Sequence, residues 1–325
     1  MDPAQFLTAP RVTIVAGKGG VGKTTVSAAL GLAASRCGLR ALILEVEGKS
    51  GLPTIFGRPE LSYDEIVLVP ADASRGWAEL RARTISADEA LVEYLGDHGL
   101  QRISNRLARS GALDMVTTAT PGIKDVLVLG KLKQIERSGV ADVIVMDAHA
   151  AGHAITFLKS AAGLLDAVRK GPIQTQAREV QDLLTDASRC QVVLVTLPEE
   201  TPVNELVETA FSLEDEIGVK LGPVVVNGLY PILAGLEVDP ETAAAEVGAS
   251  LRPGEADAMR SAARFRTERT NLQSDQVARL GKELPLSQLR LPFLFTSDID
   301  LADLTELADR IIQEITELPD NEVGP

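Results

Sequence analysis

The sequence predicts an α/β fold in which helices cover a doubly wound, mostly parallel sheet. Short apolar, β-branched runs alternate with longer stretches of helical spacing along the chain. This alternation is typical of parallel strands joined by right-handed crossover helices. A glycine-rich segment directly follows the first apolar run, and folds of this class bind ligands at the carboxyl ends of their strands. We interpret residues 1–325 as one domain of this fold.

The first element is the segment from Val12 to Thr25, which reads VTIVAGKGGVGKTT. Its β-branched start predicts a buried strand, and the apolar spacing from Val26 to Cys37 predicts a helix after it. The glycine-rich stretch between them matches G-x-x-x-x-G-K-[ST], the loop of P-loop NTPases. An ordinary glycine-rich turn is the alternative. The predicted nucleotide-binding residues here are Gly17, Gly19, Gly20, Val21, Gly22, Lys23, Thr24 and Thr25.

The residue types of this loop suit a nucleoside triphosphate. Glycines let successive backbone N–H groups point at phosphate oxygens, and a helix N-terminus adds partial positive charge. Lys23 would contact the β- and γ-phosphates, and the Thr24 hydroxyl would ligate Mg²⁺. The loop therefore predicts a triphosphate and a magnesium ion as ligands.

Lys18 follows the first glycine and gives the string GKGGVGKTT. A lysine in a loop is by itself usually exposed and passive. In this string, however, the chain resembles the deviant Walker A ATPases. They include the arsenite-pump ATPase, the guided-entry ATPase for tail-anchored proteins, the Min and Par ATPases and nitrogenase iron protein. The resemblance implies Mg-ATP hydrolysis by a nucleotide-sandwich dimer, in which Lys18 contacts the partner's nucleotide in trans.

The run from Ala41 to Val46 predicts a second strand, which ends in Glu45-Val46-Glu47. The resemblance implies that Glu47 begins switch I and positions the attacking water. The family residue there is usually Asp, and Glu is one methylene longer. A solvated carboxylate at the strand end is the alternative, and the sequence leaves both open.

The next segments predict a strand over Ile66 to Val69 and then a helical insertion at 73–119. The resemblance implies that such an insertion carries the surface for a client or partner protein. A pair of covering helices without any partner is the alternative. A further helix is expected to begin near Thr120-Pro121-Gly122-Ile123.

A buried strand is predicted over Ala141 to Ala148, and Asp147 lies at its end. A carboxylate at this place would hold Mg²⁺ through its water shell; a helix N-cap is the alternative. The stretch from Asp147 to Leu158, DAHAAGHAITFL, resembles switch II of the arsenite-pump and guided-entry branch. The resemblance implies that the backbone of Gly152 approaches the γ-phosphate and that His153 couples nucleotide state to the following helix.

Later strands are predicted over Gln191 to Leu197, Gly222 to Leu229 and Leu291 to Phe295. Asn227 matches a family position that contacts adenine, for which an amide has suitable donor and acceptor groups; a turn residue before a glycine is the alternative. A helix with an acidic surface is expected from Leu301 to Leu318. Its acidity does not suit a membrane-surface anchor.

Composition excludes several classes of function. The formal net charge of −14 opposes binding to nucleic acid or to anionic membranes. No apolar run approaches the roughly 20 residues needed to cross a bilayer, and no signal peptide is recognisable. Two isolated cysteines offer no zinc or iron–sulfur motif. We therefore expect a cytoplasmic protein without stable membrane insertion.

Three functional hypotheses follow. The first is an active ATPase switch, a homodimer or heterodimer that binds an unknown client. The second is a weakly catalytic subunit paired with a paralogous ATPase chain, which the Glu47 substitution favours. The third is a partition or positioning ATPase, which the acidic composition disfavours. Arsenite handling and tail-anchored protein delivery are both disfavoured, because the sequence shows no thiol cluster, zinc clamp or large methionine-rich groove.

Overall fold

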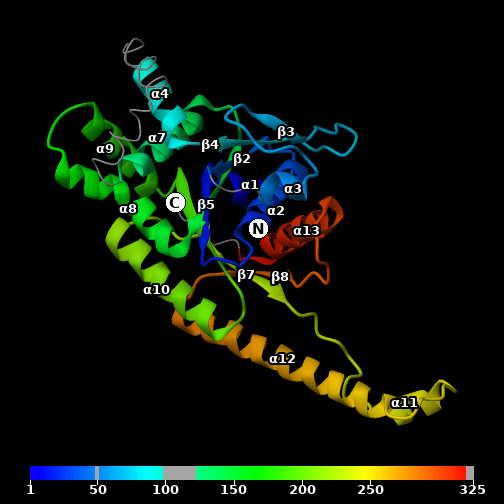
Figure 1. Cartoon of the computed structure of the whole chain (residues 1–325). Helices are drawn as coiled ribbons and strands as arrows, with labels where there is room; N and C mark the ends of the chain where they lie inside the picture. The colour runs from blue at the N-terminus through cyan, green and yellow to red at the C-terminus, as the bar shows by residue number, and fades with distance from the viewer. Residues whose placement is uncertain (48–50, 98–121, 320–325) are drawn as a thin grey trace.

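The computed structural model describes residues 1–47, 51–97 and 122–319. These residues form an eight-stranded sheet in the order β3-β4-β2-β5-β1-β6-β7-β8 (Figure 1). Its neighbouring strands are parallel except for the antiparallel pair β3–β4. The strands are β1 (Val12–Gly17), β2 (Ala41–Val46), β3 (Ile66–Val69), β4 (Leu80–Ile85), β5 (Val143–Ala150), β6 (Cys190–Thr196), β7 (Val224–Leu229) and β8 (Gln288–Pro292). The predicted doubly wound, mostly parallel α/β fold is confirmed.

Helices cover both faces of this sheet (Figure 1). One face carries α1 (Pro3–Thr8), α2 (Lys23–Arg36), α3 (Gly51–Ile55) and α13 (Leu301–Glu317). The other carries α7 (Ile123–Ser138), α8 (Ala151–Ala167), α9 (Pro172–Thr185) and α10 (Glu200–Ile217). The helix α4 (Ala87–Asp97) lies against α7. The central strand β1 is buried along its whole length, as a parallel strand covered on both faces should be.

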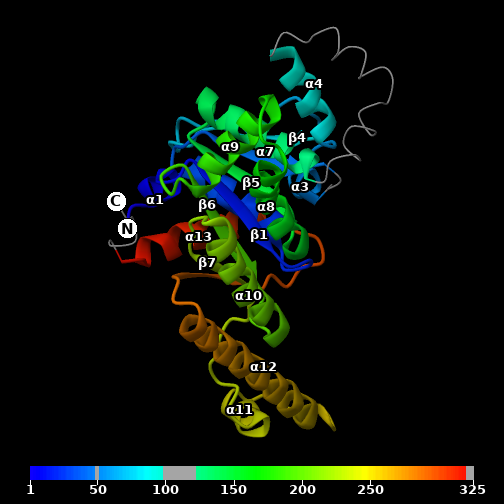
Figure 2. The ribbon, with the colours of Figure 1, turned by 90° about the vertical axis from the view of Figure 1, so that its left-hand side faces the viewer.

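Two further helices extend away from this layered body. The short α11 (Pro240–Glu246) packs on the long α12 (Glu255–Glu283), and both lie between β7 and β8 in the chain. Figure 2 shows the pair projecting beyond the rest of the molecule. The C-terminal half of α12 connects this pair to the sheet. Within the described ranges, none of the helices combines the length and apolar character needed to span a bilayer.

The expectation of a mostly helical segment at 73–119 is wrong at its start. The structure has strand β4 at Leu80–Ile85, beside β2, and only then the helix α4. The sequence LRARTI alternates apolar and arginine residues, which is a strand period rather than a helical one. Residues 98–119 lie outside the described residues, so the insertion and its partner surface stay predictions. The last strand, β8, begins and ends three residues earlier than expected.

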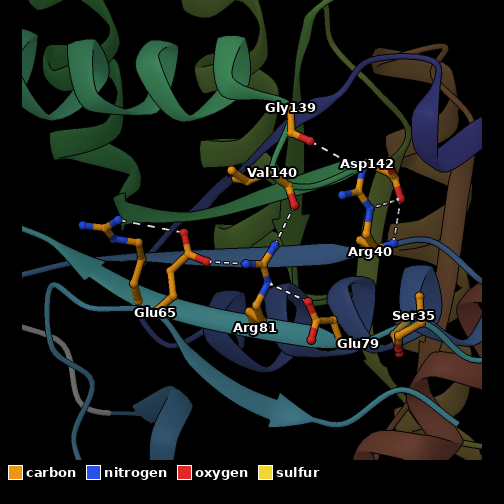
Figure 3. Close-up of polar contacts among 10 residues, drawn as sticks. Ser35, Arg40, Glu65, Glu79, Arg81, Gly139, Val140 and Asp142 are labelled. Carbon is orange, nitrogen blue, oxygen red and sulfur yellow. Dashed lines mark hydrogen bonds and ion pairs between the residues drawn. The ribbon is translucent and has the colours of Figure 1, made fainter.

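A polar network closes the edge of the sheet away from the phosphate loop (Figure 3). Arg81 on β4 forms an ion pair with Glu65 at 2.7 Å and donates to the carbonyl of Val140 at 2.6 Å. Arg40, just before β2, forms an ion pair with Asp142 just before β5, also at 2.7 Å. The guanidinium of Arg40 lowers the pKa of the Asp142 carboxyl through their hydrogen bond. These contacts lie at the amino ends of β4, β2 and β5 or in the loops beside them. The candidate site lies at the opposite, carboxyl ends of these parallel strands.

Candidate functional site

The glycine-rich loop lies between the carboxyl end of β1 and the amino end of α2. Gly20 and Gly22 adopt φ angles of +85° and +90°, which L-residues with side chains rarely adopt. A Cβ on Gly22 would lie 2.4 Å from Nδ2 of Asn227, and one on Gly17 would lie 2.4 Å from the carbonyl oxygen of Val195. The loop is therefore wedged between β6 and β7, and space as well as φ requires glycine at Gly17 and Gly22.

Lys23 begins α2 and is nearly buried. Its Nζ donates to the backbone carbonyl of Lys18 at 2.8 Å. The ammonium therefore lies beside the backbone at the start of the same loop. Gly22 provides no side-chain cap for α2. The first N–H groups of this helix and the Lys23 ammonium thus form a positive cradle suited to phosphate oxygens.

Thr24 and Asp147 are the two predicted metal ligands, and the structure brings them together. The Thr24 hydroxyl donates to Oδ2 of Asp147 at 2.8 Å, although the residues are 123 positions apart. Asp147 is fully buried within β5, where it pairs with Val15 of β1, and the strand continues past the predicted end to Ala150. A hydroxyl and a carboxylate are hard oxygen donors, and Mg²⁺ prefers such donors. The donor chemistry of this pair therefore fits a magnesium site.

Glu45 is a site residue that the sequence reasoning did not select. It is register partner to Asp147 on the neighbouring strand and is only 1% exposed. Side chains alternate along a strand, and Ile43 and Val145 belong to the core on the α2 face. Glu45 and Asp147 therefore project from that same face, toward the amino end of α2. The sequence does offer a signal for Glu45, because it is an acidic residue within an otherwise apolar strand. Carboxylates are rarely buried unless they have a partner, and here a second carboxylate lies beside it.

Glu47 lies just beyond the end of β2 with its side chain exposed. Its backbone N–H donates to the carbonyl of Ile85 at 3.0 Å, which extends the contact between β2 and β4. Residues 48–50 lie outside the described ranges. The chain continues at Gly51, where a Cβ would lie 3.3 Å from Cγ2 of Thr24. The first residue of α3 thus lies beside the predicted metal ligand Thr24.

Asn227, at the carboxyl end of β7, has a role that the sequence did not predict. Its Nδ2 donates to the carbonyl of Val21 at 3.0 Å and so holds the phosphate loop. The contact with adenine stays a prediction, and the alternative of a turn residue is compatible with Gly228 at φ +76°. Gly152 lies in the first turn of α8, and its approach to a γ-phosphate also stays a prediction.

Gln273 on α12 ties the projecting helix to this same strand end. It is 2% exposed; its Oε1 accepts from the N–H of Tyr230 at 2.8 Å, and its Nε2 donates to the carbonyl of Gly228 at 3.1 Å. Both partners follow Asn227 in the chain within three residues. Gln273 therefore supports the backbone that presents Asn227 to the phosphate loop. Sequence spacing offered no signal for this contact, which joins residues about 45 positions apart.

Replacing Gln273 by leucine is expected to destabilise the protein by about 2–3 kcal/mol, because two half-buried backbone groups lose their partner. The free energy of unfolding in urea measures this. Ser274→Ala, on the exposed neighbouring position, is the control and should change stability by less than about 0.5 kcal/mol. Equal stability of Q273L and wild type would contradict the anchoring role of Gln273.

Lys18 is part of the loop, but its side chain points to another element. Its Nζ forms an ion pair with Oε1 of Glu205 on α10 in the same chain. Both side chains remain partly exposed, at 43% for Lys18 and 37% for Glu205. The structure therefore places Lys18 at the surface of the candidate site, held by a carboxylate of its own chain.

The comparisons with known proteins agree with this site. The family model of the anion-transporting ATPases matches residues 10–176, which include the phosphate loop and Asp147. The chain belongs to this ArsA-type ATPase family. It is 32% identical to the ATPase BagA of Mycobacterium tuberculosis over 95% of this chain and 94% of that protein. Membership in this family implies the binding of ATP.

Two relatives with more specific names match shorter stretches of this ArsA-type ATPase. A putative arsenical pump-driving ATPase of Halobacterium salinarum is 26% identical over 68% of this chain and 36% of that protein. The ATPase get3 of Schizosaccharomyces japonicus is 29% identical over 48% of this chain and 45% of its own. These names describe those proteins and do not define the partner of this chain.

The two cysteines of this ArsA-type ATPase lie on opposite faces of the sheet. Cys190 is buried in the core on the α8 face, whereas Cys37 packs against the core on the α2 face. Burial raises the pKa of the Cys190 thiol to about 12, so its thiolate is scarce near neutral pH. One chain therefore does not bring two thiols to a common arsenite.

Proposed function

We propose that this chain is a Mg²⁺-dependent ATP hydrolase that works as a nucleotide-switched dimer and binds a partner or client protein. The contact between Thr24 and Asp147 carries the proposal, because it joins the start of α2, directly after the phosphate loop, to β5 with magnesium-binding chemistry. Family membership supports ATP as the nucleotide.

In this proposal each residue of the site has a separate task. Lys23 and the N–H groups of the glycine loop bind and orient the phosphates and offset their charge. Thr24 and Asp147 would hold Mg²⁺, directly and through water respectively, and the ion would supply charge stabilisation at the β- and γ-phosphates. Glu47 would orient the attacking water, and Lys18 would contribute positive charge to the nucleotide of the second copy.

The position of Lys18 and the similarity to a named relative support the proposals of a dimer and of a client protein. Exposure of Lys18 at the open edge of the site suits an action in trans, and the related ATPase get3 belongs to the same family. Hydrolysis would then change conformation and partner contacts rather than transform a small molecule. We expect this to take place in the cytoplasm.

The second candidate is a weakly catalytic subunit that pairs with a paralogous ATPase. Glu47 favours it, because this longer acid stands at the exposed end of β2 where the family usually has Asp. A gain in hydrolysis on Glu47→Asp would support this candidate, and full turnover by the wild type would contradict it. A partition-type function has no comparable support, since the chain carries a net charge of −14.

Removal of magnesium with EDTA is expected to abolish ATP turnover, and Asp147→Asn should raise the half-maximal Mg²⁺ concentration by about 10- to 100-fold. The reason is that the neutral amide holds the water shell of the ion less strongly. Titration of Mg²⁺ into protein with a fluorescent ATP analogue measures the shift without requiring hydrolysis. Asp142→Asn is the matched control, because Asp142 lies before the opposite end of the same strand. An unchanged Mg²⁺ midpoint in D147N would contradict the proposed metal site.

A further inference from the structure

The ion pair between Lys18 and Glu205 has a consequence for how two copies of this chain would combine. Lys18 extends from the phosphate loop, and Glu205 extends from the second turn of α10. The two residues are 187 positions apart, so α10 and the loop hold them together through the fold. The contact therefore fixes the direction of the Lys18 side chain in the single chain.

The position of α10 is itself fixed by α12. Arg269 on α12 forms an ion pair with Glu199, the N-cap residue of α10. Arg279 donates to Oδ1 of Asn204 at 2.7 Å and to the carbonyl of Glu200 at 3.3 Å. These contacts hold the first turn of α10, and Glu205 is the residue after Asn204. The carboxylate of Glu205 is thus presented to Lys18 by an anchored helix end rather than by a free loop.

We propose that Glu205 is a positioning residue that holds Lys18 against its own chain and that must release it before Lys18 can serve the nucleotide of a second copy. This inference rests on the proposed dimeric function. The ammonium next to Glu205 is largely neutralised, and the carboxylate itself would repel an incoming triphosphate. The nucleotide of the second copy, with its greater negative charge, would compete with Glu205 for the same ammonium.

The exposure of the pair sets the size of the effect. Partly exposed ion pairs change an equilibrium by up to about fivefold, and a symmetric dimer would release two of them. Assembly of Glu205→Gln should therefore be favoured by up to about 25-fold over assembly of the wild type. A penalty of this size disfavours assembly of the nucleotide-free chains, and the charge of a bound nucleotide would offset it. Added salt should reduce the difference, because it screens exposed charges.

The test compares the wild type with Glu205→Gln, Glu208→Gln and Lys18→Ala. Glu208 is the matched control, because it lies on the exposed side of the same helix and its replacement removes the same charge. Sedimentation in the presence of a non-hydrolysable ATP analogue gives the dimer fraction against protein concentration, and ATP turnover is followed over the same range. Thermal unfolding of each variant establishes that it is folded.

The expected result is a lower half-maximal concentration in E205Q, by about 5- to 25-fold, for both dimer formation and turnover, with E208Q like the wild type. Equal curves for E205Q and E208Q would overturn the role of Glu205. A loss of turnover in E205Q as severe as that in K18A would overturn it too, since Glu205 would then be required for the productive position of Lys18. If K18A itself assembles and turns over like the wild type, the proposed dimeric mechanism fails instead.

Discussion

Replacing Lys23 by methionine is expected to lower the rate of ATP hydrolysis about a thousandfold. The ammonium lies at the start of α2 and donates to the carbonyl of Lys18, so it is placed within the loop that would enclose the phosphates. Loss of one preorganised donor from such a site typically costs about 10²–10³ in rate, and this donor carries a full charge. Methionine keeps a side chain of similar length without the charge. Single-turnover and steady-state hydrolysis both measure the effect.

The stability of Lys23→Met separates this effect from unfolding. Lys23 is nearly buried, and the variant loses the hydrogen bond to the carbonyl of Lys18 but no longer buries a charged group. The free energy of unfolding should therefore stay within about 1 kcal/mol of the wild type. Lys170→Met, at an exposed position far along the chain, is the control for loss of a lysine charge. Turnover in K23M within tenfold of the wild type would contradict the assignment of this loop to phosphate binding.

Replacing Gly22 by alanine is expected to lower the free energy of unfolding by about 3 kcal/mol. A φ angle of +90° costs an L-residue about 1–2 kcal/mol. In addition, the new Cβ would lie 2.4 Å from Nδ2 of Asn227 and would displace the amide from the carbonyl of Val21. Loss of that hydrogen bond adds about 1 kcal/mol. Urea denaturation without nucleotide measures the total.

Gly20 provides a matched comparison for this prediction. Its φ is +85°, but a Cβ there would meet no atom of the described residues within 4 Å. Gly20→Ala should therefore show the dihedral cost alone, about 1–2 kcal/mol. Combining G22A with Asn227→Ala removes the obstacle, and the cost of G22A in that background should fall to the cost of G20A. Equal costs in both backgrounds would show that Asn227 does not support the loop as the structure describes.

Most of the candidate site residues that the sequence selected are encoded within one continuous motif. The phosphate loop, Lys23 and Thr24 lie in a segment whose spacing reflects a single strand–loop–helix unit. Asp147 was predictable because a buried strand ending in a carboxylate belongs at the same edge of a parallel sheet. Their juxtaposition at 2.8 Å follows from the pairing of β1 with β5.

The parts that the sequence did not predict depend on contacts between distant elements. Glu205 and Gln273 lie on helices whose orientation is set by tertiary packing, so their partners cannot be read from local spacing. Glu45 was named only as part of a strand end, because its burial depends on register with Asp147. The strand β4 was missed because its arginines resemble those of a surface helix. In the structure, Arg81 and Arg83 form ion pairs with Glu65 at the sheet edge.

The specific activity of the purified wild-type chain tests the central claim most directly. It is the rate of Mg-ATP hydrolysis divided by protein concentration, followed over several decades of that concentration. A nucleotide-switched homodimer predicts that this specific activity rises with concentration and reaches a plateau. A specific activity that is high and constant down to the lowest concentration would contradict action in trans. Binding of ATP without hydrolysis at any concentration would contradict an active homodimer and would favour the paired, weakly catalytic subunit.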